Sequence, residues 1–209
     1  GIKGIRSLSL VVEEKAILQN GDNQSVIFLK GVDDNYRFTT GVADHIEKGE
    51  YNIGTEDEPR LILGAGIEGA LGIQAERNPF ILKIYLPRKS NTEQIDPLND
   101  ISNDSIRTSS AFIIQQDFDN KYGFTNIEFT KRALKLGPDE YSSTEIALQD
   151  PDADSDIKRQ IERILGPGYL VQTRYQQNQS LYSIMTLERW VIFGVLCLIL
   201  VVAAFTMIG

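Results

Sequence analysis

Apolar residues are spaced along the chain in short alternating or continuous runs, which is typical of β-strands. Residues 7–12 and 15–19 lead into the turn residues Asn20 and Gly21, and residues 25–32 form a second apolar run directly after this turn. This order predicts a β-hairpin. Further strands are expected at residues 60–63, 80–86, 110–115, 125–129, 144–148 and 169–173.

Helical segments are predicted between these strands, where apolar residues recur at helical spacing before a glycine or proline. They cover residues 39–48, 66–71, 131–136 and 155–165, which end before Gly49, Gly72, the Gly137–Pro138 pair and Gly166. Strands and helices interleave in short units, so the expected fold class is α+β.

The longest polar stretch runs from residue 87 to 108, with two prolines and many Asn, Asp and Ser residues. Loops longer than about 12 to 15 residues in a compact domain are usually functional or disordered. We therefore expect a long loop here that serves binding.

The carboxyl-terminal part of the chain predicts a membrane helix. Residues 190–208 are 19 consecutive residues without a charge, and a helix of that length spans ~28 Å, close to the hydrocarbon thickness of a bilayer. Glu188 and Arg189 flank it, and Trp190 stands where an interfacial aromatic residue is expected. Residues 175–193 contain no proline or glycine, which favours one continuous helix through 175–189 into the membrane.

Composition excludes several classes of function. The chain has a formal net charge of -8 and no Lys/Arg stripe with interleaved aromatic residues, so nucleic acid is not an expected partner. Cys197 is the single cysteine and His45 the single histidine, so no zinc cluster or internal disulfide can form. His45 lies in a charged segment and is interpreted as a solvated surface residue.

Two motifs resemble ligand sites but fail in context. Gly64, Gly66 and Gly69 spell G-x-G-x-x-G, yet the helix after them ends at Gly72, too early for a dinucleotide fold. We interpret these glycines as a tight strand–turn–helix junction. No P-loop motif occurs, and the alternating acidic residues at 150–156 lack the glycine and glutamate of a calcium loop. These acidic residues and Ser155 are expected to cap the next helix. We therefore predict no catalytic residues, no cofactor and no metal, and hence no enzyme.

Six short motifs carry a family resemblance: Leu-Lys-Gly-Val-Asp at 29–33, Leu-Gly-Ala-Gly-Ile at 63–67, Leu-Gly-Ile at 71–73, Asn-Gln-Ser-Leu-Tyr at 178–182, Leu-Glu-Arg-Trp at 187–190 and Ala-Ala-Phe-Thr-Met-Ile-Gly at 203–209. Through them the chain resembles the lipoprotein-releasing ABC transporter permeases of the FtsX/MacB-like permease superfamily, and its sequence looks most similar to Bacteroidetes-type homologues. The chain begins without methionine, and we expect it to be part of a longer protein.

The resemblance implies a periplasmic domain followed by the second of four membrane helices. It further implies two subdomains, with residues 1–34 and 112–174 forming an outer one and 35–111 inserted in it. Residues 175–189 would form a juxtamembrane helix and 190–208 the transmembrane helix. The expected location is the bacterial inner membrane, with residues 1–189 in the periplasm.

The implied function is extraction of lipoproteins from the inner membrane and their delivery to a periplasmic carrier. The implied partners are a second permease chain, identical or not, two cytoplasmic ATPase subunits, the carrier, the lipoprotein cargo and the lipid bilayer. ATP hydrolysis would reside in the separate ATPase subunits, and cytoplasmic motion would reach the periplasmic domain through the membrane helix.

The 87–108 loop is the candidate partner-binding element, because a projecting loop at the corresponding place in the family resembles a hook that engages the carrier. Within it, Arg88 and Lys89 are expected to steer by charge, and Ile95, Pro97 and Leu98 to form an apolar anchor. Alternatives are an efflux or cell-division-type permease that transmits ATP-driven motion to a periplasmic partner, and a single-span receptor ectodomain.

Overall fold

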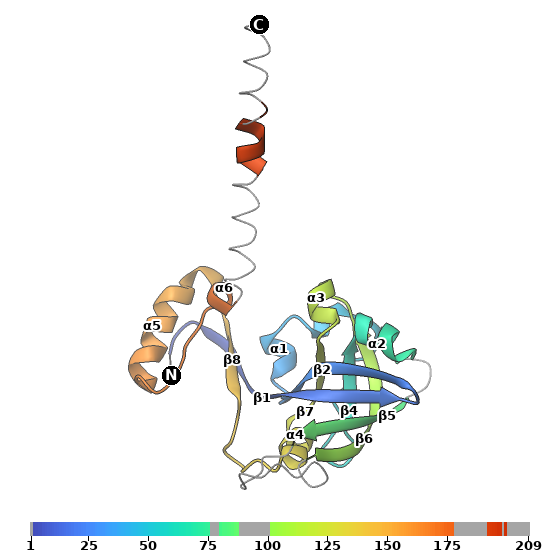
Figure 1. Ribbon diagram of the computed structural model, residues 1–209. Helices are drawn as coiled ribbons and strands as arrows, with labels where there is room; N and C mark the ends of the chain where they lie inside the picture. The colour runs from blue at the N-terminus through green and yellow to red at the C-terminus, as the bar shows by residue number, and fades with distance from the viewer. Residues whose placement is uncertain (1, 76–79, 88–100, 178–191, 198, 200–209) are drawn as a thin grey trace, which may run out of the picture. The chain divides into compact units, whose positions relative to one another are not determined.

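In the computed structural model, the described residues are 2–75, 80–87, 101–177, 192–197 and 199. The chain divides into two compact units. The first, Ile5–Gln149, is called the barrel unit below, and the second, Gly1–Gly4 with Asp150–Gly209, the terminal unit. Mixed helix and strand content agrees with the predicted α+β class (Figure 1).

The barrel unit contains eight strands in one sheet. They are β1 (Ile5–Asn20), β2 (Asn23–Val32), β3 (Ile46–Gly49), β4 (Arg60–Gly64), β5 (Ile81–Pro87), β6 (Ile101–Phe112), β7 (Tyr122–Asn126) and β8 (Ser143–Leu148). Its helices are α1 (Tyr36–Thr39), the 3-10 turn Ala43–His45, α2 (Ala65–Leu71), α3 (Gln116–Asp119) and α4 (Ile127–Leu134).

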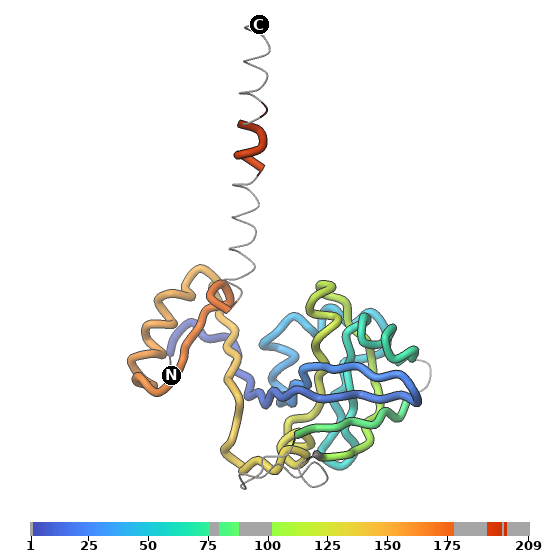
Figure 2. Tube along the Cα trace, viewed as in Figure 1, coloured from blue at the N-terminus to red at the C-terminus, as the bar shows by residue number. Residues whose placement is uncertain are grey.

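Six strands close on themselves, in the order β1-β2-β7-β4-β6-β5 and back to β1. The β2–β7 and β4–β6 pairs are parallel, and the other pairs are antiparallel. The closing element is the long hairpin of β1 and β2, which appears as two blue tubes side by side in Figure 2. Its two-residue connection contains Gly21 at φ 58, a conformation that favours glycine. β8 extends the ring at β1, and β3 extends it at β6.

The main hydrophobic core lies on the inner side of this ring. Strand residues from β1, β2, β4, β5 and β6 meet residues of α2 and α4 there, and the fully buried strand members are Val12, Leu18, Ile27, Leu29, Leu61, Leu63, Leu82 and Ile84. β7 contributes Gly123 at its inward position, where an added Cβ would lie 3.1 Å from Ile27 Cδ1. Successive side chains of each strand point alternately to the inside and to the outside of the ring, and the inward ones form this core.

A second core covers part of the outer face. Val11, Val32, Ile62, Phe112 and Phe124 point outward from the ring and are covered by residues that include Tyr36, Val42 and Ile53. The Tyr36 and Phe124 ring centroids are 5.4 Å apart. Burial raises the pKa of the Tyr36 hydroxyl well above its usual value, so this tyrosine stays neutral.

The glycine motif forms a strand–turn–helix junction, as predicted. A Cβ on Gly64 would lie 2.0 Å from the Asp119 carbonyl oxygen, and one on Gly66 would lie 1.7 Å from Asn120 Oδ1. The end of α3 and the residue after it thus pack against the start of α2, where a phosphate would have to lie in a nucleotide-binding turn. Gly72 ends α2 at φ 64. Glu68 on α2 is buried and accepts hydrogen bonds from Ala75 N at 2.7 Å and Lys48 Nζ at 3.2 Å.

Several sequence predictions of elements are confirmed, and others are wrong. The hairpin, the strands at 60–63, 80–86 and 144–148, and the helices at 66–71 and 155–165 are present. The predicted helix at 39–48 is wrong, because this segment contains the end of α1, a 3-10 turn and β3, which pairs with β6. The predicted strand at 169–173 is also absent from the described structure.

Two further boundaries differ for identifiable reasons. Residues 125–129 alternate polar and apolar like a strand, but Asn126 ends β7 and caps α4. The helix predicted at 131–136 therefore begins at Ile127 and ends at Leu134, followed by Lys135 at φ 57. The 87–108 loop is shorter than predicted, because β6 already starts at Ile101, and the strand predicted at 110–115 is the end of β6.

The strands of the predicted insert, residues 35–111, belong to the same sheet as the other strands of the barrel unit. β4, β5 and most of β6 come from this range, and they pair within the same ring as β1, β2 and β7. The two compact units divide before Ile5 and after Gln149. The division into an outer and an inserted subdomain stays a prediction.

The terminal unit contains α5 (Asp154–Leu165), preceded by the 3-10 turn Pro151–Ala153, and α6 (Arg174–Gln177). Asp150 caps the turn by accepting from Asp152 N at 3.0 Å, whereas the Ser155 hydroxyl donates to Asp154, so Ser155 does not act as the predicted cap. Of the predicted membrane helix, residues 192–197 and 199 are described, and they are helical. Within the described parts of the chain, no helix is long and apolar enough to cross a membrane.

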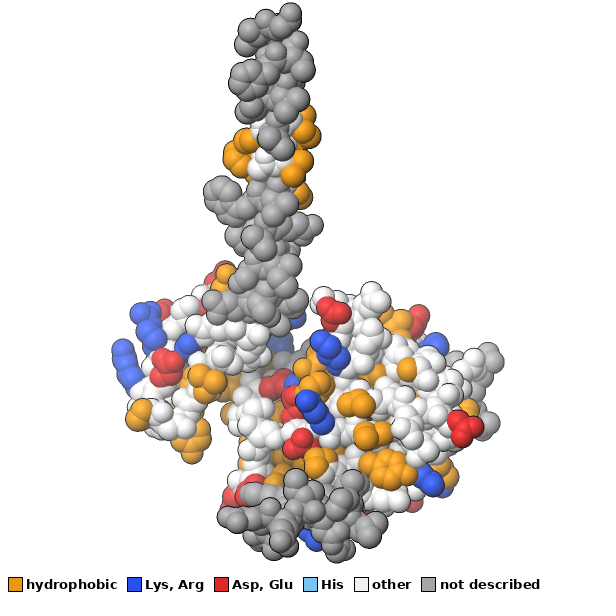
Figure 3. Space-filling model, viewed as in Figure 1, with side chains coloured by type: hydrophobic (Ala, Val, Ile, Leu, Met, Phe, Trp, Pro, Cys, Tyr) orange, Lys and Arg blue, Asp and Glu red, His pale blue; other side chains and the backbone are white. Residues whose placement is uncertain are grey.

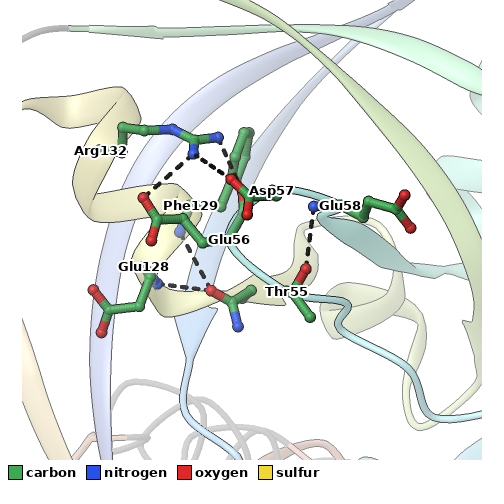
Figure 4. Close-up of polar contacts among 8 residues, drawn as sticks. Thr55, Glu56, Asp57, Glu58, Glu128, Phe129 and Arg132 are labelled. Carbon is green, nitrogen blue, oxygen red and sulfur yellow. Dashed lines mark hydrogen bonds and ion pairs between the residues drawn. The ribbon is translucent and has the colours of Figure 1, made fainter.

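The segment between β3 and β4 is fastened to α4 by side-chain contacts (Figure 4). Asn126 Oδ1 accepts from Glu128 N at 2.9 Å and Phe129 N at 3.3 Å, and its amide donates to Gly54 O at 3.4 Å. Arg132 donates to the Glu56 carbonyl oxygen at 3.0 Å and pairs with its carboxylate at 3.3 Å. Asn126 thus supplies a hydrogen-bond acceptor for two amide groups at the start of α4 and a donor for one carbonyl of the segment between β3 and β4.

We predict that Gly64→Ala lowers the free energy of unfolding by about 1–3 kcal/mol, because the new methyl group would overlap the Asp119 backbone. Gly69→Ala is the matched control, since Gly69 lies in α2, the helix that follows Gly64, with open space around it, and this change should raise stability by about 0.5–1 kcal/mol. Chemical denaturation of the barrel unit measures both. Equal effects of the two changes would contradict the packing role of Gly64.

We also predict that Asn126→Ala costs about 1 kcal/mol of stability, because two amide groups at the start of α4 lose their acceptor. Arg132→Ala, on the same helix, should change stability by less than about 0.5 kcal/mol, because its ion pair with Glu56 is half-exposed. Thermal unfolding of the two variants tests this order. A larger loss for Arg132→Ala would show that the ion pair fixes the loop.

Candidate partner-binding site

The predicted binding loop is carried by the antiparallel pair β5–β6. Their register aligns Ile81 with Arg107 and continues to Pro87 opposite Ile101. The thirteen residues 88–100, which lie outside the described residues, therefore connect the ends of two paired strands. A loop that starts and ends on neighbouring strands has both of its ends fixed by the sheet.

Inward side chains anchor this hairpin in the core. Leu82, Ile84 and Leu86 are at most 1% exposed, and Ile106 opposite Leu82 is equally buried. Ser102 is buried as well and donates to Asp104 Oδ2 at 2.6 Å. Because β5 also pairs with β1, and β6 with β4, the hairpin is held on both edges.

The outward side of the hairpin carries cations and no carboxylate among its described residues. It consists of Ile81, Lys83, Tyr85 and Pro87 on β5 with Asn103, Ser105 and Arg107 on β6. Ile81 is 60% exposed, and the Tyr85 hydroxyl donates to Gln19 Oε1 at 3.0 Å. The chain has a net charge of -8, but the charged side chains described on this surface, Lys83 and Arg107, are both positive. Such a surface is suited to an acidic partner.

The predicted site residues lie outside the described part of the chain. This holds for the loop residues Arg88, Lys89, Ile95, Pro97 and Leu98 and for the membrane-interface residues Glu188, Arg189 and Trp190. Arg88 and Lys89 directly follow Pro87 in the sequence, so the cations of β5 continue into the start of the loop. Their roles stay predictions.

A partly buried charge cluster was not predicted from the sequence. Lys30 Nζ lies 2.7 Å from Glu145 and 3.5 Å from Glu13, and 5.3 Å from the centroid of the Tyr122 ring. Burial lowers the pKa of Lys30, but Glu145 and Glu13 together outweigh this, so the pKa lies above its usual value. The cluster joins β8 to β1, β2 and β7, and its three charged residues are far apart in the sequence, so no spacing signal marks it.

The remaining residue types that could catalyse a reaction or bind a metal are considered next. His45 is exposed, and its Nδ1 lies 2.7 Å from the Gly41 carbonyl oxygen. No group of three or more His, Cys, Asp or Glu residues in the described ranges could hold a metal ion. The β5–β6 hairpin, which carries the ends of segment 88–100, is the candidate binding element.

Comparison with known sequences gives one relative of the expected kind. No protein-family model matches the chain. The lipoprotein-releasing system transmembrane protein LolC of Xylella fastidiosa (strain 9a5c) is 23% identical over 208 residues, which cover 95% of this chain. The chain spans 46% of the length of that relative.

Solved structures show the fold. The extracellular domain of the noncanonic ABC-type transporter YknZ from Gram-positive bacteria superposes with a TM-score of 0.54 at 9% identity, over 79% of this chain and 76% of that domain. The periplasmic region of MacB from Actinobacillus actinomycetemcomitans gives 0.48 at 13% identity, over 78% and 69%. The resemblance inferred from the sequence is confirmed: the chain is similar to a lipoprotein-releasing system transmembrane protein, and its fold is similar to that of the extracellular domain of an ABC-type transporter.

Proposed function

We propose that this chain is part of a permease that extracts lipoproteins from the bacterial inner membrane and passes them to a periplasmic carrier. The observation that carries the proposal is the hairpin β5–β6, which holds both ends of segment 88–100 on a closed barrel. The similarity to a lipoprotein-releasing protein supports this choice of substrate. The chain itself would be non-catalytic.

The other partners follow from the same proposal. A second permease chain and cytoplasmic ATPase subunits would complete the transporter, and segment 190–208 would anchor it in the bilayer. A continuous helix over residues 175–208 would transmit ATP-driven motion to the periplasmic residues. The helical conformation of α6, Arg174–Gln177, at the start of this range supports the proposal.

An efflux or cell-division-type permease is the alternative. It is favoured by the fold similarity to the extracellular domain of a noncanonic ABC-type transporter, which is the solved structure with the higher TM-score. Both functions use a rigid domain moved by ATP hydrolysis, and they differ in the partner that binds to it. The partner of the 88–100 loop therefore discriminates between them. A single-span receptor has no such support.

We predict that replacing residues 89–99 with a Gly-Ser segment of equal length abolishes carrier binding and lipoprotein release in the full permease–ATPase complex. The replacement stops before Ile101 because that residue begins β6. Binding of purified carrier and release of a lipoprotein from proteoliposomes are the measurements. Unchanged ATPase activity serves as the folding control. Full carrier binding by this variant would remove the loop from the proposal.

Two smaller variants separate the roles assigned within the loop. Replacing Arg88 and Lys89 with Ser should slow association and weaken its salt dependence, because long-range attraction is lost. Replacing Ile95, Pro97 and Leu98 with Ser should speed dissociation, because an apolar anchor is lost. Stopped-flow or surface-based kinetics distinguish the two effects. Identical kinetics in both variants would contradict this division.

We further predict that segment 190–208 is a membrane anchor. The full chain should sediment with membranes and need detergent for extraction, whereas a chain ending at Thr173 should stay in buffer. Membrane fractionation with alkaline carbonate washing is the measurement. A full chain released by carbonate would show that the segment does not span the bilayer.

A further inference from the structure

Helix α5 is joined to the barrel unit through the ends of two neighbouring strands. β8 ends at Leu148, and a short segment that contains the 3-10 turn Pro151–Ala153 separates it from α5. In the β1–β8 pair, Leu148 lies opposite Ile5, the first residue of β1. The chain therefore crosses between its two compact units at two adjacent strand ends, before Ile5 and after Gln149.

The residue before β1 packs against α5. Gly4 has φ 97, and a Cβ added to it would lie 3.0 Å from Ile157 Cδ1. Ile157 is the buried residue of α5. Glycine suits this position for two reasons, because the backbone conformation favours it and because Ile157 approaches closely. α5 thus holds both strand ends, since β8 continues into it and the residue before β1 packs on it.

The next residue of α5 contacts α6. Lys158 Nζ donates to Gln176 Oε1 at 2.7 Å and lies 3.6 Å from Glu162 Oε1. Gln176 Oε1 also accepts from Thr173 N at 3.2 Å, and Gln176 N donates to Thr173 Oγ1 at 3.3 Å. These reciprocal bonds form a capping box, the Thr-x-x-Gln pattern that starts a helix. Lys158 therefore bonds to the residue that fixes the beginning of α6.

The contact between α5 and α6 crosses a polar cleft. The side chains that line this cleft include Asp154, Ser155, Lys158, Glu162, Thr173 and Tyr175. The buried Ile157 lies against Gly4 instead. The described parts of the two helices are thus joined by hydrogen bonds across an open cleft, and a packed apolar core does not fill the space between them.

The cations of α5 differ in their surroundings. The space-filling view shows Lys and Arg side chains gathered over α5 (Figure 3). The Arg159 side chain is 68% exposed and pairs with Asp156 of the same helix. The Lys158 side chain is only 21% exposed. Shielding from water strengthens a hydrogen bond that a charged group makes, so the bond of Lys158 to Gln176 is the stronger candidate for a structural link.

We infer that α5 is the connecting helix through which α6 moves the barrel unit, and that Lys158 is the positioning residue that holds α6 to α5. The inference rests on the proposed ATP-driven movement of helix 175–208. A hydrogen bond across an open cleft allows two arrangements, in which α5 and α6 move together or separately. The charged, shielded bond of Lys158 favours the first arrangement. Motion that enters at α6 then passes through α5 to β8 and β1.

The test uses the full permease–ATPase complex in proteoliposomes. Spin labels on Cys197 and on Asp22→Cys, in the exposed turn of the β1–β2 hairpin, report the distance between the membrane segment and the barrel unit. ATP should shift this distance in the complex that carries no further change. Lys158→Met removes the ammonium group, so it should abolish the shift and lower lipoprotein release per ATP hydrolysed about tenfold, while ATPase activity is retained. Gln176→Leu removes the acceptor and should have the same effect.

Two matched variants control for charge and for folding. Lys158→Arg keeps a charged donor and should keep the ATP-dependent shift. Arg159→Met removes the neighbouring cation, which pairs within α5, and should also keep the shift. If Lys158 served stability alone, Lys158→Met would lower the Tm of the complex and leave the shift of the folded molecules unchanged.

The outcomes separate this inference from the proposed function. A shift that persists in Lys158→Met, or that is lost equally in Arg159→Met, would overturn the inference and leave the proposed function standing. Failure of both Lys158→Met and Gln176→Leu to assemble would show that the contact serves folding, and absence of any shift without these changes would show that nothing is transmitted; either result overturns the inference. A normal shift without lipoprotein release would refute the proposed substrate and leave the role of Lys158 in place.

Discussion

The closed ring of strand pairing is the constraint on which the rest of the barrel unit depends. β1 is hydrogen-bonded to β2 along Val11–Asn20 and to β5 at Ile17–Gln19, so both of its edges are used in the same stretch. A shift of one residue in either register would turn every inward side chain of β1 outward. Ala16 and Leu18 would leave the core, and Lys15 and Ile17 would enter it. Closure therefore fixes the inside and the outside of the barrel together.

The inner and outer faces of the ring have different roles. Inward residues such as Leu82, Ile84 and Leu86 serve packing with α2 and α4, where a single lost methylene is costly. Outward residues of the same strands are free to serve binding, except where the second core covers them around Tyr36. A stiff barrel would suit the proposed function, because a soft domain would absorb motion that reached it from a membrane helix.

Buried polar contacts attach the outer segments to the ring. Asp33 accepts from Ser9 at 2.6 Å and from Leu10 N at 3.1 Å, which fixes the start of the segment leading to α1. Lys30 holds Glu145 of β8, and Glu68 holds the segment after α2. Each contact joins residues that are distant in the sequence or in different elements, so removing one partner would weaken the attachment of that segment.

The sequence by itself determined the local elements, the α+β class and, through its motifs, the permease resemblance. Alternation in residues 25–32 and 80–86 marks strands, and Gly72 marks a helix end, because these signals act between neighbouring residues. Tertiary structure alone decided that β1 and β2 close a ring, that residues 46–49 pair as a strand, and that residues 127–129 begin a helix. It also decided which face of β5 and β6 points outward. Alternation defines two faces of a strand but not which one is buried, since burial depends on strands brought together from across the chain.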